Sequence, residues 1–183
     1  MKTGGKLPRG GKLREERRGK MGGKLRVKTR GKKLCLACSS GGHLTQMLQL
    51  EPLYQRYDCF FITEDSVLLG ELSLARRVYR VTLANRRMRL FPLILLKNSF
   101  RVLRILRKER PDVVVSTGAL NAVPVCYLAK LLGSRIVFIE SFAKLSEPSL
   151  SGRLVSPIAD LFIVQWESML RYYRKAVYGG SLY

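Results

Sequence analysis

Six short apolar runs recur along the chain, and they limit what it can fold into. Each is four to six residues long, and the Val-rich run that follows Pro111 is the clearest. Runs of this length, with β-branched residues and little alternation, are typical of strands buried on both faces. The expected strands are residues 34–38, 59–63, 78–83, 112–116, 135–139 and 161–164.

Apolar residues between these runs recur with a helical period, as at Leu44, Met47 and Leu48. Strands that alternate with helices favour a parallel sheet covered on both faces. We therefore predict an α/β fold, a Rossmann-like domain over residues 34–183 that follows a basic tail over residues 1–33. The expected helices are 43–57, 93–108, 121–132 and 167–176.

The formal net charge of +21 is distributed unevenly. Residues 1–33 hold 14 Lys and Arg against two Glu, with almost no bulky apolar side chains. A segment of this composition cannot bury enough surface to offset its ordering entropy, so we expect it to be disordered when alone. Its charge leaves three alternatives open, namely binding to anionic lipid, binding to RNA, and no role.

Four cysteines include a C-x-x-C pair, Cys35 and Cys38, but no second cluster follows it. All four lie in apolar contexts, which favours reduced thiols that pack as small hydrophobes over a zinc or redox site. We expect no metal and no cofactor. No stretch approaches the ~20 apolar residues that span a bilayer, so a cytoplasmic protein that lies on a membrane surface is expected.

A two-glycine loop separates the first strand from the first helix. A helix start leaves backbone N–H groups unpaired and carries the positive end of the helix dipole. Glycines let an anion approach those amides closely, and a neighbouring histidine adds a titratable group. The pattern predicts a phosphate or diphosphate site, although an ordinary strand-to-helix turn has similar residues. The candidates are Ser39, Ser40, Gly41, Gly42 and His43.

Polar residues also follow three later strands. Because the carboxyl ends of parallel strands meet at one edge of the sheet, these residues are expected near the glycine loop. The alternative for Glu140 is a structural role as a salt-bridged framework residue, and the alternative for Trp166 is packing in the protein interior. The substrate-binding and catalytic candidates from these strand ends are Thr117, Gly118, Asn121, Glu140, Ser141 and Trp166.

The predicted helix 93–108 combines a wide apolar arc with a stripe of cations spaced along one face. A helix of this kind suits an anionic membrane surface, where each basic residue contributes about 1 kcal/mol. The alternative is an ordinary crossover helix with its apolar face on the sheet. The membrane-binding candidates are Phe91, Leu93, Leu96, Lys97, Phe100, Arg101, Arg104 and Lys108.

Four segments, taken in order and spacing, resemble a known family. They are Ser40-Gly41-Gly42-His43, Ser116-Thr117-Gly118, Glu140-Ser141-Phe142-Ala143-Lys144 and Val164-Gln165-Trp166. Together they resemble the acceptor-side, membrane-associated subunits of two-component glycosyltransferases. That family includes the eukaryotic subunit that anchors the second GlcNAc transferase of N-glycan assembly, and bacterial subunits for capsule and exopolysaccharide synthesis.

The resemblance implies one half of an inverting GT-B enzyme that is inactive alone. The acceptor would be a sugar on a polyprenyl diphosphate, held at the cytosolic face of an anionic membrane. A separate donor-binding subunit would bring the UDP-sugar, and His43 or Glu140 would orient or deprotonate the acceptor hydroxyl. Eukaryotic members carry an N-terminal membrane helix where this chain has a basic segment, and Gln46 stands where some members have an acid.

Two other functions compete with this one. A dinucleotide-binding Rossmann protein would use Glu64 or Asp65 to bind a ribose, but the loop lacks the G-x-G-x-x-G pattern. A nucleic-acid-binding protein would use the basic tail, but no recognisable RNA or DNA module accompanies the charge. Nucleic acid is therefore not the expected partner.

Overall fold

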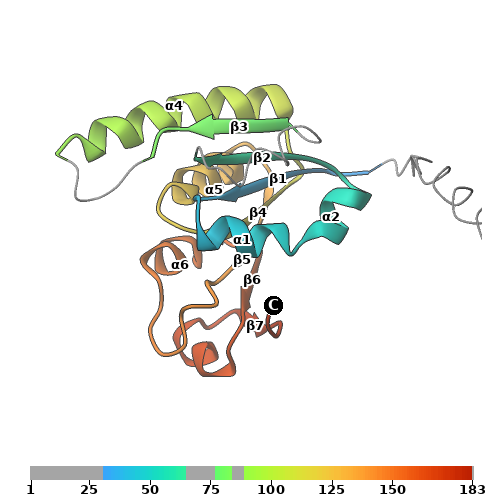
Figure 1. Ribbon diagram of the computed structural model, residues 1–183, viewed down its shortest axis with the longest axis vertical. Helices are drawn as coiled ribbons and strands as arrows, with labels where there is room; N and C mark the ends of the chain where they lie inside the picture. The colour runs from blue at the N-terminus through green and yellow to red at the C-terminus, as the bar shows by residue number, and fades with distance from the viewer. Residues whose placement is uncertain (1–30, 65–76, 84–88, 183) are drawn as a thin grey trace, which may run out of the picture.

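The computed structural model describes residues 31–64, 77–83 and 89–182. These residues form a seven-stranded, wholly parallel sheet in the order β3-β2-β1-β4-β5-β6-β7 (Figure 1). The strands are β1 Lys33–Cys38, β2 Asp58–Glu64, β3 Arg77–Val81, β4 Val113–Gly118, β5 Arg135–Ile139, β6 Leu161–Val164 and β7 Ala176–Tyr178.

Helices cover both faces of this sheet. On one face, α4, α5 and α6 pack over a core that includes Cys35 and Phe60, and on the other, α1 and α2 pack over Leu36 and Phe61. The six predicted strands and the α/β fold class are therefore confirmed. The helical elements are α1 Gly42–Leu48, α2 Glu51–Arg56, α4 Phe91–Glu109, α5 Ala122–Leu131, α6 Leu150–Val155 and the 3₁₀ helix η1 Glu167–Tyr172.

Two of the predicted helices were wrong in extent or type. The helix expected over 43–57 is broken between α1 and α2, because Pro52 in the first turn of α2 has no N–H for a continuous helix. The helix expected over 167–176 is the short η1, followed by the edge strand β7. The short α6 was not predicted at all.

The C-x-x-C pair is divided by the sheet. Cys35 belongs to the core on the α4 face, and Cys38 belongs to the core on the α1 face, so the two thiols lie on opposite sides of β1. All four cysteines are free and buried, as expected. Burial raises the pKa of Cys38 and of Cys126 to about 12, so both stay protonated thiols at neutral pH.

The strand order reverses direction between β1 and β4, where the chain connections leave toward opposite sides. In open α/β sheets the crevice at the carboxyl ends of such strands is the usual ligand site. The glycine loop follows β1 and Gly118 ends β4, so both lie at this point. Of the basic tail, residues 1–30 lie outside the described residues, and so does Asp65, one of the two acids considered for ribose binding.

Candidate functional site

The glycine loop presents open backbone at the start of α1. Gly41 caps the helix at a φ of 79°, a left-handed conformation that favours glycine. The amide of Thr45 makes the first helical hydrogen bond, to Gly41 O at 3.0 Å, which leaves the amides of Gly42 and His43 outside the helical pattern. A Cβ built on Gly41 or Gly42 would meet no atom within 4 Å, so a ligand can approach this backbone.

His43 is held against the end of β4 by two reciprocal hydrogen bonds. Its Nδ1 lies 2.8 Å from Thr117 O, and Thr117 Oγ1 donates to His43 O at 2.8 Å. A carbonyl oxygen only accepts, so Nδ1 must carry the proton. The neutral ring therefore has its lone pair on Nε2, which makes that nitrogen the acceptor.

Gly118 lies directly against the imidazole. Its φ is 104°, and a Cβ at this position would lie 3.3 Å from His43 Cε1 and 3.4 Å from Ser151 Oγ. The end of β4, the start of α1 and the first turn of α6 therefore meet at one point. Ser151 is buried here and was not predicted, because α6 itself carries no sequence pattern that marks a site.

A buried carboxylate holds the serines of the loop. Glu64, at the end of β2, is only 2% exposed. It accepts hydrogen bonds from Ser39 Oγ at 3.2 Å, from Ser40 Oγ at 3.0 Å and from the Ser40 amide at 3.4 Å. Both hydroxyls are thus used inside the protein in this structure, and their predicted contact with substrate stays a prediction.

Asn121 Nδ2 also donates to Glu64, which links the start of α5 to the same carboxylate. Its Oδ1 is buried and has no hydrogen-bond partner among the described residues. The carboxylate of Glu64 is therefore surrounded by neutral donors and is not open to a ribose hydroxyl, which argues against the dinucleotide-binding alternative.

Glu140 lies at the end of β5 and is 1% exposed. Its carboxylate accepts hydrogen bonds from the amides of Ser141 at 2.8 Å and Ser149 at 3.3 Å, and from the Tyr173 hydroxyl. Burial, followed by this hydrogen bond, raises the pKa of Tyr173. The geometry favours Glu140 as a residue that positions the loop before α6, and its catalytic role stays a prediction.

Trp166 is packed rather than open. Its Nε1 donates to Phe142 O at 2.7 Å, and the two ring centroids are 4.9 Å apart. Gln165 beside it donates to Gln46 Oε1 at 3.1 Å and to Glu140 O at 2.9 Å. These contacts join α1 to the ends of β5 and β6, which gives Gln46 a structural place.

Helix α4 divides its apolar residues between two faces. Val102, Ile105 and Leu106 are buried against the sheet. A second apolar group points outward, with Leu93 63%, Leu96 55% and Phe100 58% exposed. A groove of about 610 Å³ runs along this outer group and is also lined by Lys97, Arg101 and Arg104.

The outer cations Lys97, Arg101, Arg104 and Lys108 are exposed, and within the described residues none forms an ion pair. In the part of the chain that the structure describes, no helix combines the length and the apolar content needed to cross a bilayer.

Comparison with known proteins gives a family. The profile of the family described as "Oligosaccharide biosynthesis protein Alg14 like" matches residues 63–182. The UDP-N-acetylglucosamine transferase subunit ALG14 of Candida albicans is 47% identical over 81 residues, which are 41% of this chain and 37% of that protein. The human protein of that name is 34% identical over 84 residues, 43% of this chain and 39% of that protein. The chain thus spans about two fifths of the curated relatives it matches.

Solved structures agree on the fold. MurG from Acinetobacter baumannii matches with a TM-score of 0.62 at 18% identity, over 75% of this chain and 42% of MurG. UDP-N-acetylglucosamine 2-epimerase from Rickettsia bellii matches with a TM-score of 0.65 at 16% identity, over 83% of this chain and 45% of that enzyme. At these identities the likeness concerns the fold, which is the Rossmann-like half of a GT-B architecture.

Proposed function

The chain belongs to the Alg14 family, and from this premise we propose that it is the acceptor-side subunit of an inverting, UDP-sugar-dependent glycosyltransferase. It would hold a polyprenyl-diphosphate-linked sugar at the membrane and recruit a separate donor-binding subunit. The names of its relatives support N-acetylglucosamine as the transferred sugar. The residues that match MurG in fold are less than half of that chain, and the proposed donor-binding subunit would supply the other half.

The position of His43 beside open loop amides carries this proposal. The amides of Gly41, Gly42 and His43 would hold the diphosphate of the acceptor, because unpaired N–H groups at a helix start attract anions. The imidazole, fixed through Nδ1, would present Nε2 as the proton acceptor for the same substrate.

The chemical step then needs one proton acceptor on this chain. Nε2 of His43 would take the proton of the acceptor hydroxyl as its oxygen attacks the anomeric carbon of the donor. The bond from that carbon to the UDP oxygen breaks with its electron pair on UDP, so the configuration inverts. Glu140 would keep the loop before α6 in place and would not exchange the proton itself.

The outer face of α4 would lie on the membrane. Its three exposed apolar side chains and four exposed cations match an anionic lipid surface, and each cation contributes about 1 kcal/mol there. This placement puts the acceptor lipid beside the domain, on what we propose is the cytosolic face.

Reconstitution with the donor-binding subunit from the same organism tests the proposal. The assay follows transfer of radiolabelled N-acetylglucosamine from UDP to a GlcNAc-diphosphate-lipid acceptor. We expect His43→Ala to lower kcat by about 10²-fold or more, as loss of a general base does. Arg171→Ala, on the exposed surface of η1, serves as the control.

Near-normal turnover by His43→Ala would remove His43 from the site, although the subunit role would stand. No transfer from any UDP-sugar by the parent pair would contradict the subunit role itself.

A further inference from the structure

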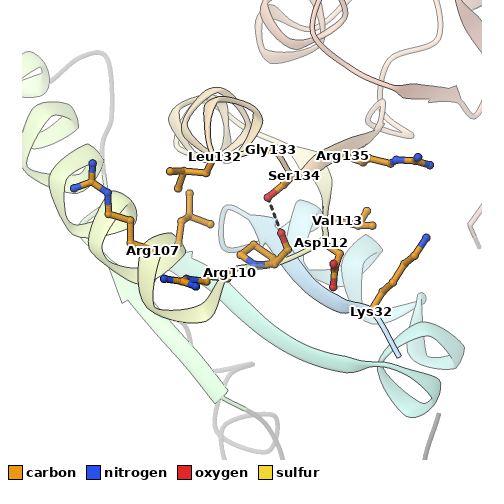
Figure 2. Close-up of a pocket in the computed structure, with 11 residues that line it drawn as sticks. Lys32, Arg107, Arg110, Asp112, Val113, Leu132, Gly133, Ser134 and Arg135 are labelled. Atoms are coloured by element: carbon orange, nitrogen blue, oxygen red, sulfur yellow. Dashed lines mark hydrogen bonds between the residues drawn. The ribbon is translucent and has the colours of Figure 1, made fainter. Parts of the chain in front are cut away.

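A second cavity lies at the opposite end of the sheet from His43, and Figure 2 shows the residues that line it. It has a volume of about 750 Å³ and lies where β4 and β5 begin, between the last turns of α4 and α5. Its floor includes Leu106 and Pro111, both buried. Four exposed cations line it, Lys32, Arg107, Arg110 and Arg135, together with one carboxylate, Asp112.

These cations are not explained by ion pairs. Across the described ranges, none of the four has a carboxylate oxygen within 4.0 Å, whereas Lys33, Arg77 and Lys130 are all paired. Asp112 accepts a hydrogen bond of 2.7 Å from the Lys33 amide. The cavity lining therefore holds four positive charges against one carboxylate. Arg135 extends away from Arg107 and Arg110 in Figure 2, and its charge also acts on Asp160.

The helix ends account for these cations only in part. Cations near a helix C-terminus often serve its free carbonyls. Some of these carbonyls already have main-chain partners, since Arg110 N donates to Leu106 O at 2.8 Å. At the end of α5, Ser134 N donates to Ala129 O at 2.9 Å and Gly133 N donates to Lys130 O at 3.0 Å.

Arg110 also stands where glycine is usual. It caps α4 at a φ of 49°, in the left-handed region that side chains other than Asn and Asp seldom adopt. The left-handed φ at Arg110 has a conformational cost that glycine would avoid, so this position keeps a guanidinium beside the cavity at some expense in backbone stability. It points to a function for the charge.

We propose that this cavity binds a phosphate-bearing anion with two or more negative charges. The guanidinium groups of Arg107 and Arg110, on the α4 side of the cavity (Figure 2), suit this chemistry, because planar guanidinium donors match phosphate oxygens in pairs. The site is separate from the loop beside His43 and does not depend on the transferase role. The phosphates can be free in solution or carried on a lipid headgroup. The lipid source is included because Arg107 follows Phe100 by two helical turns, on the face of α4 that we propose lies on the membrane.

Calorimetry on the full chain tests the free form, with sodium pyrophosphate as the probe. Cosedimentation tests the lipid form, with phosphatidylcholine vesicles that contain phosphatidylinositol 4-phosphate or phosphatidylserine at equal charge. We expect Arg107→Ala with Arg110→Ala to weaken binding about tenfold or more in at least one arm. The charge-matched pair Arg153→Ala with Arg171→Ala should weaken it less than about twofold.

If the Arg107 and Arg110 double variant binds pyrophosphate more weakly than the parent, the ligand is a free phosphate compound. If it binds more weakly only to vesicles with phosphatidylinositol 4-phosphate, the ligand is a lipid headgroup. Arg110→Gly guards against a folding defect, because it relieves the left-handed strain. It should melt at the same or a higher temperature and still bind the probe more weakly. Equal binding by both double variants and the parent in every arm overturns the proposal.

Discussion

Single residues decide how the imidazole of His43 is held. Thr117 O accepts from the imidazole Nδ1, Thr117 Oγ1 donates to the backbone carbonyl of His43, and Gly118 leaves room for the ring. The left-handed φ of Gly118 already favours glycine, so its stability and site roles overlap. Gly180 separates the two roles of Gly118. It has a similar φ of 74°, but a Cβ built on it would meet no atom within 4 Å, so a substitution there strains the backbone without displacing a neighbour.

Replacing Gly118 with Ala should therefore displace His43 as well as strain the backbone. We expect a loss of about 1–2 kcal/mol in the free energy of unfolding, measured in urea. We expect transfer by the reconstituted pair to fall tenfold or more, because small displacements of reacting groups are costly. Gly180→Ala should show a similar loss of stability with normal transfer, and equal transfer by both variants would contradict the arrangement.

Glu64 should stabilise the loop through its charge. In Glu64→Gln, the donors from Ser39, Ser40 and Asn121 would meet a neutral amide with one acceptor oxygen. We expect a loss of about 2 kcal/mol in the free energy of unfolding, since hydrogen bonds to charged groups are the stronger ones. Glu147→Gln, on the exposed loop before α6, is the control, and an equal effect of both would refute the role.

The sequence predicted which residues lie near the site better than what each does. Ser39, Ser40 and Glu140 were placed at strand ends correctly, yet their side chains are turned into the protein. Strand ends set position, whereas partners such as Glu64 and Tyr173 come from segments that only the tertiary fold brings near. Ser151 was missed for the same reason.

At the scale of elements, α4 makes the clearest separation of roles. The apolar arc predicted for this helix is wide because it contains two faces, one on the sheet and one in solvent. The helical period alone could not show which apolar residues of α4 face the sheet and which face solvent. That depends on how the helix lies against the sheet beside β3 (Figure 1). Pro52 is a similar case, because the apolar pattern continues past this residue although the helix itself is divided there into α1 and α2.

The outer face of α4 should be needed for lipid binding and not for folding. We expect Leu93→Ser, Leu96→Ser and Phe100→Ser together to lower binding to phosphatidylserine vesicles tenfold or more, with little change in melting temperature, because the side chains are already exposed. Added salt should weaken parent binding, since cations flank these residues.

The matched control changes Leu154, Leu161 and Leu170 to Ser, each 39% exposed and far along the chain from α4. Vesicle cosedimentation measures all three proteins. Equal binding by the two triple variants would show that α4 is not the docking face.

Ion pairs of Glu109 hold the C-terminal end of α4 against the sheet. Glu109, 5% exposed, accepts from Arg77 Nη1 at 2.7 Å and from Lys33 Nζ at 3.2 Å. Burial alone would raise the pKa of Glu109, but the hydrogen bonds from Tyr79 and Lys33 and the charge of Arg77 outweigh it and lower that pKa.

The lowered pKa of Glu109 in the folded state determines how its contribution to stability changes with pH. Glu109 contributes stability above its ordinary value of 4.5, and this is lost as the pH falls through the lower folded-state value. We expect Glu109→Gln to cost about 2 kcal/mol at pH 7, and the difference from the parent to shrink below about pH 4. Melting curves from pH 3 to 7 measure it, and a constant difference would contradict the assignment.

For the whole molecule, the decisive fact is that the described residues form one Rossmann-like unit of a two-unit architecture. In the proposed function, His43 as proton acceptor and the glycine loop as anion site would make a half-site at one sheet edge, to which a partner would bring the donor nucleotide. The α/β class and the parallel sheet followed from short buried runs separated by helices, because parallel strands need such crossovers, whereas the strand order came only from the structure. The donor-binding unit of the proposed complex could not be derived from this sequence, because its residues would belong to the partner subunit.

The chain alone should therefore bind acceptor without turning it over. We expect no transfer above background from UDP-N-acetylglucosamine with this chain by itself, and transfer that rises with added donor-binding subunit until the two are equimolar. His43→Ala should leave that equimolar complex intact by mass photometry while it lowers kcat, because His43 lies at the chemical step and not in a docking surface. Turnover by the isolated chain, or saturation at a ratio other than one to one, would contradict a half-site completed by one partner.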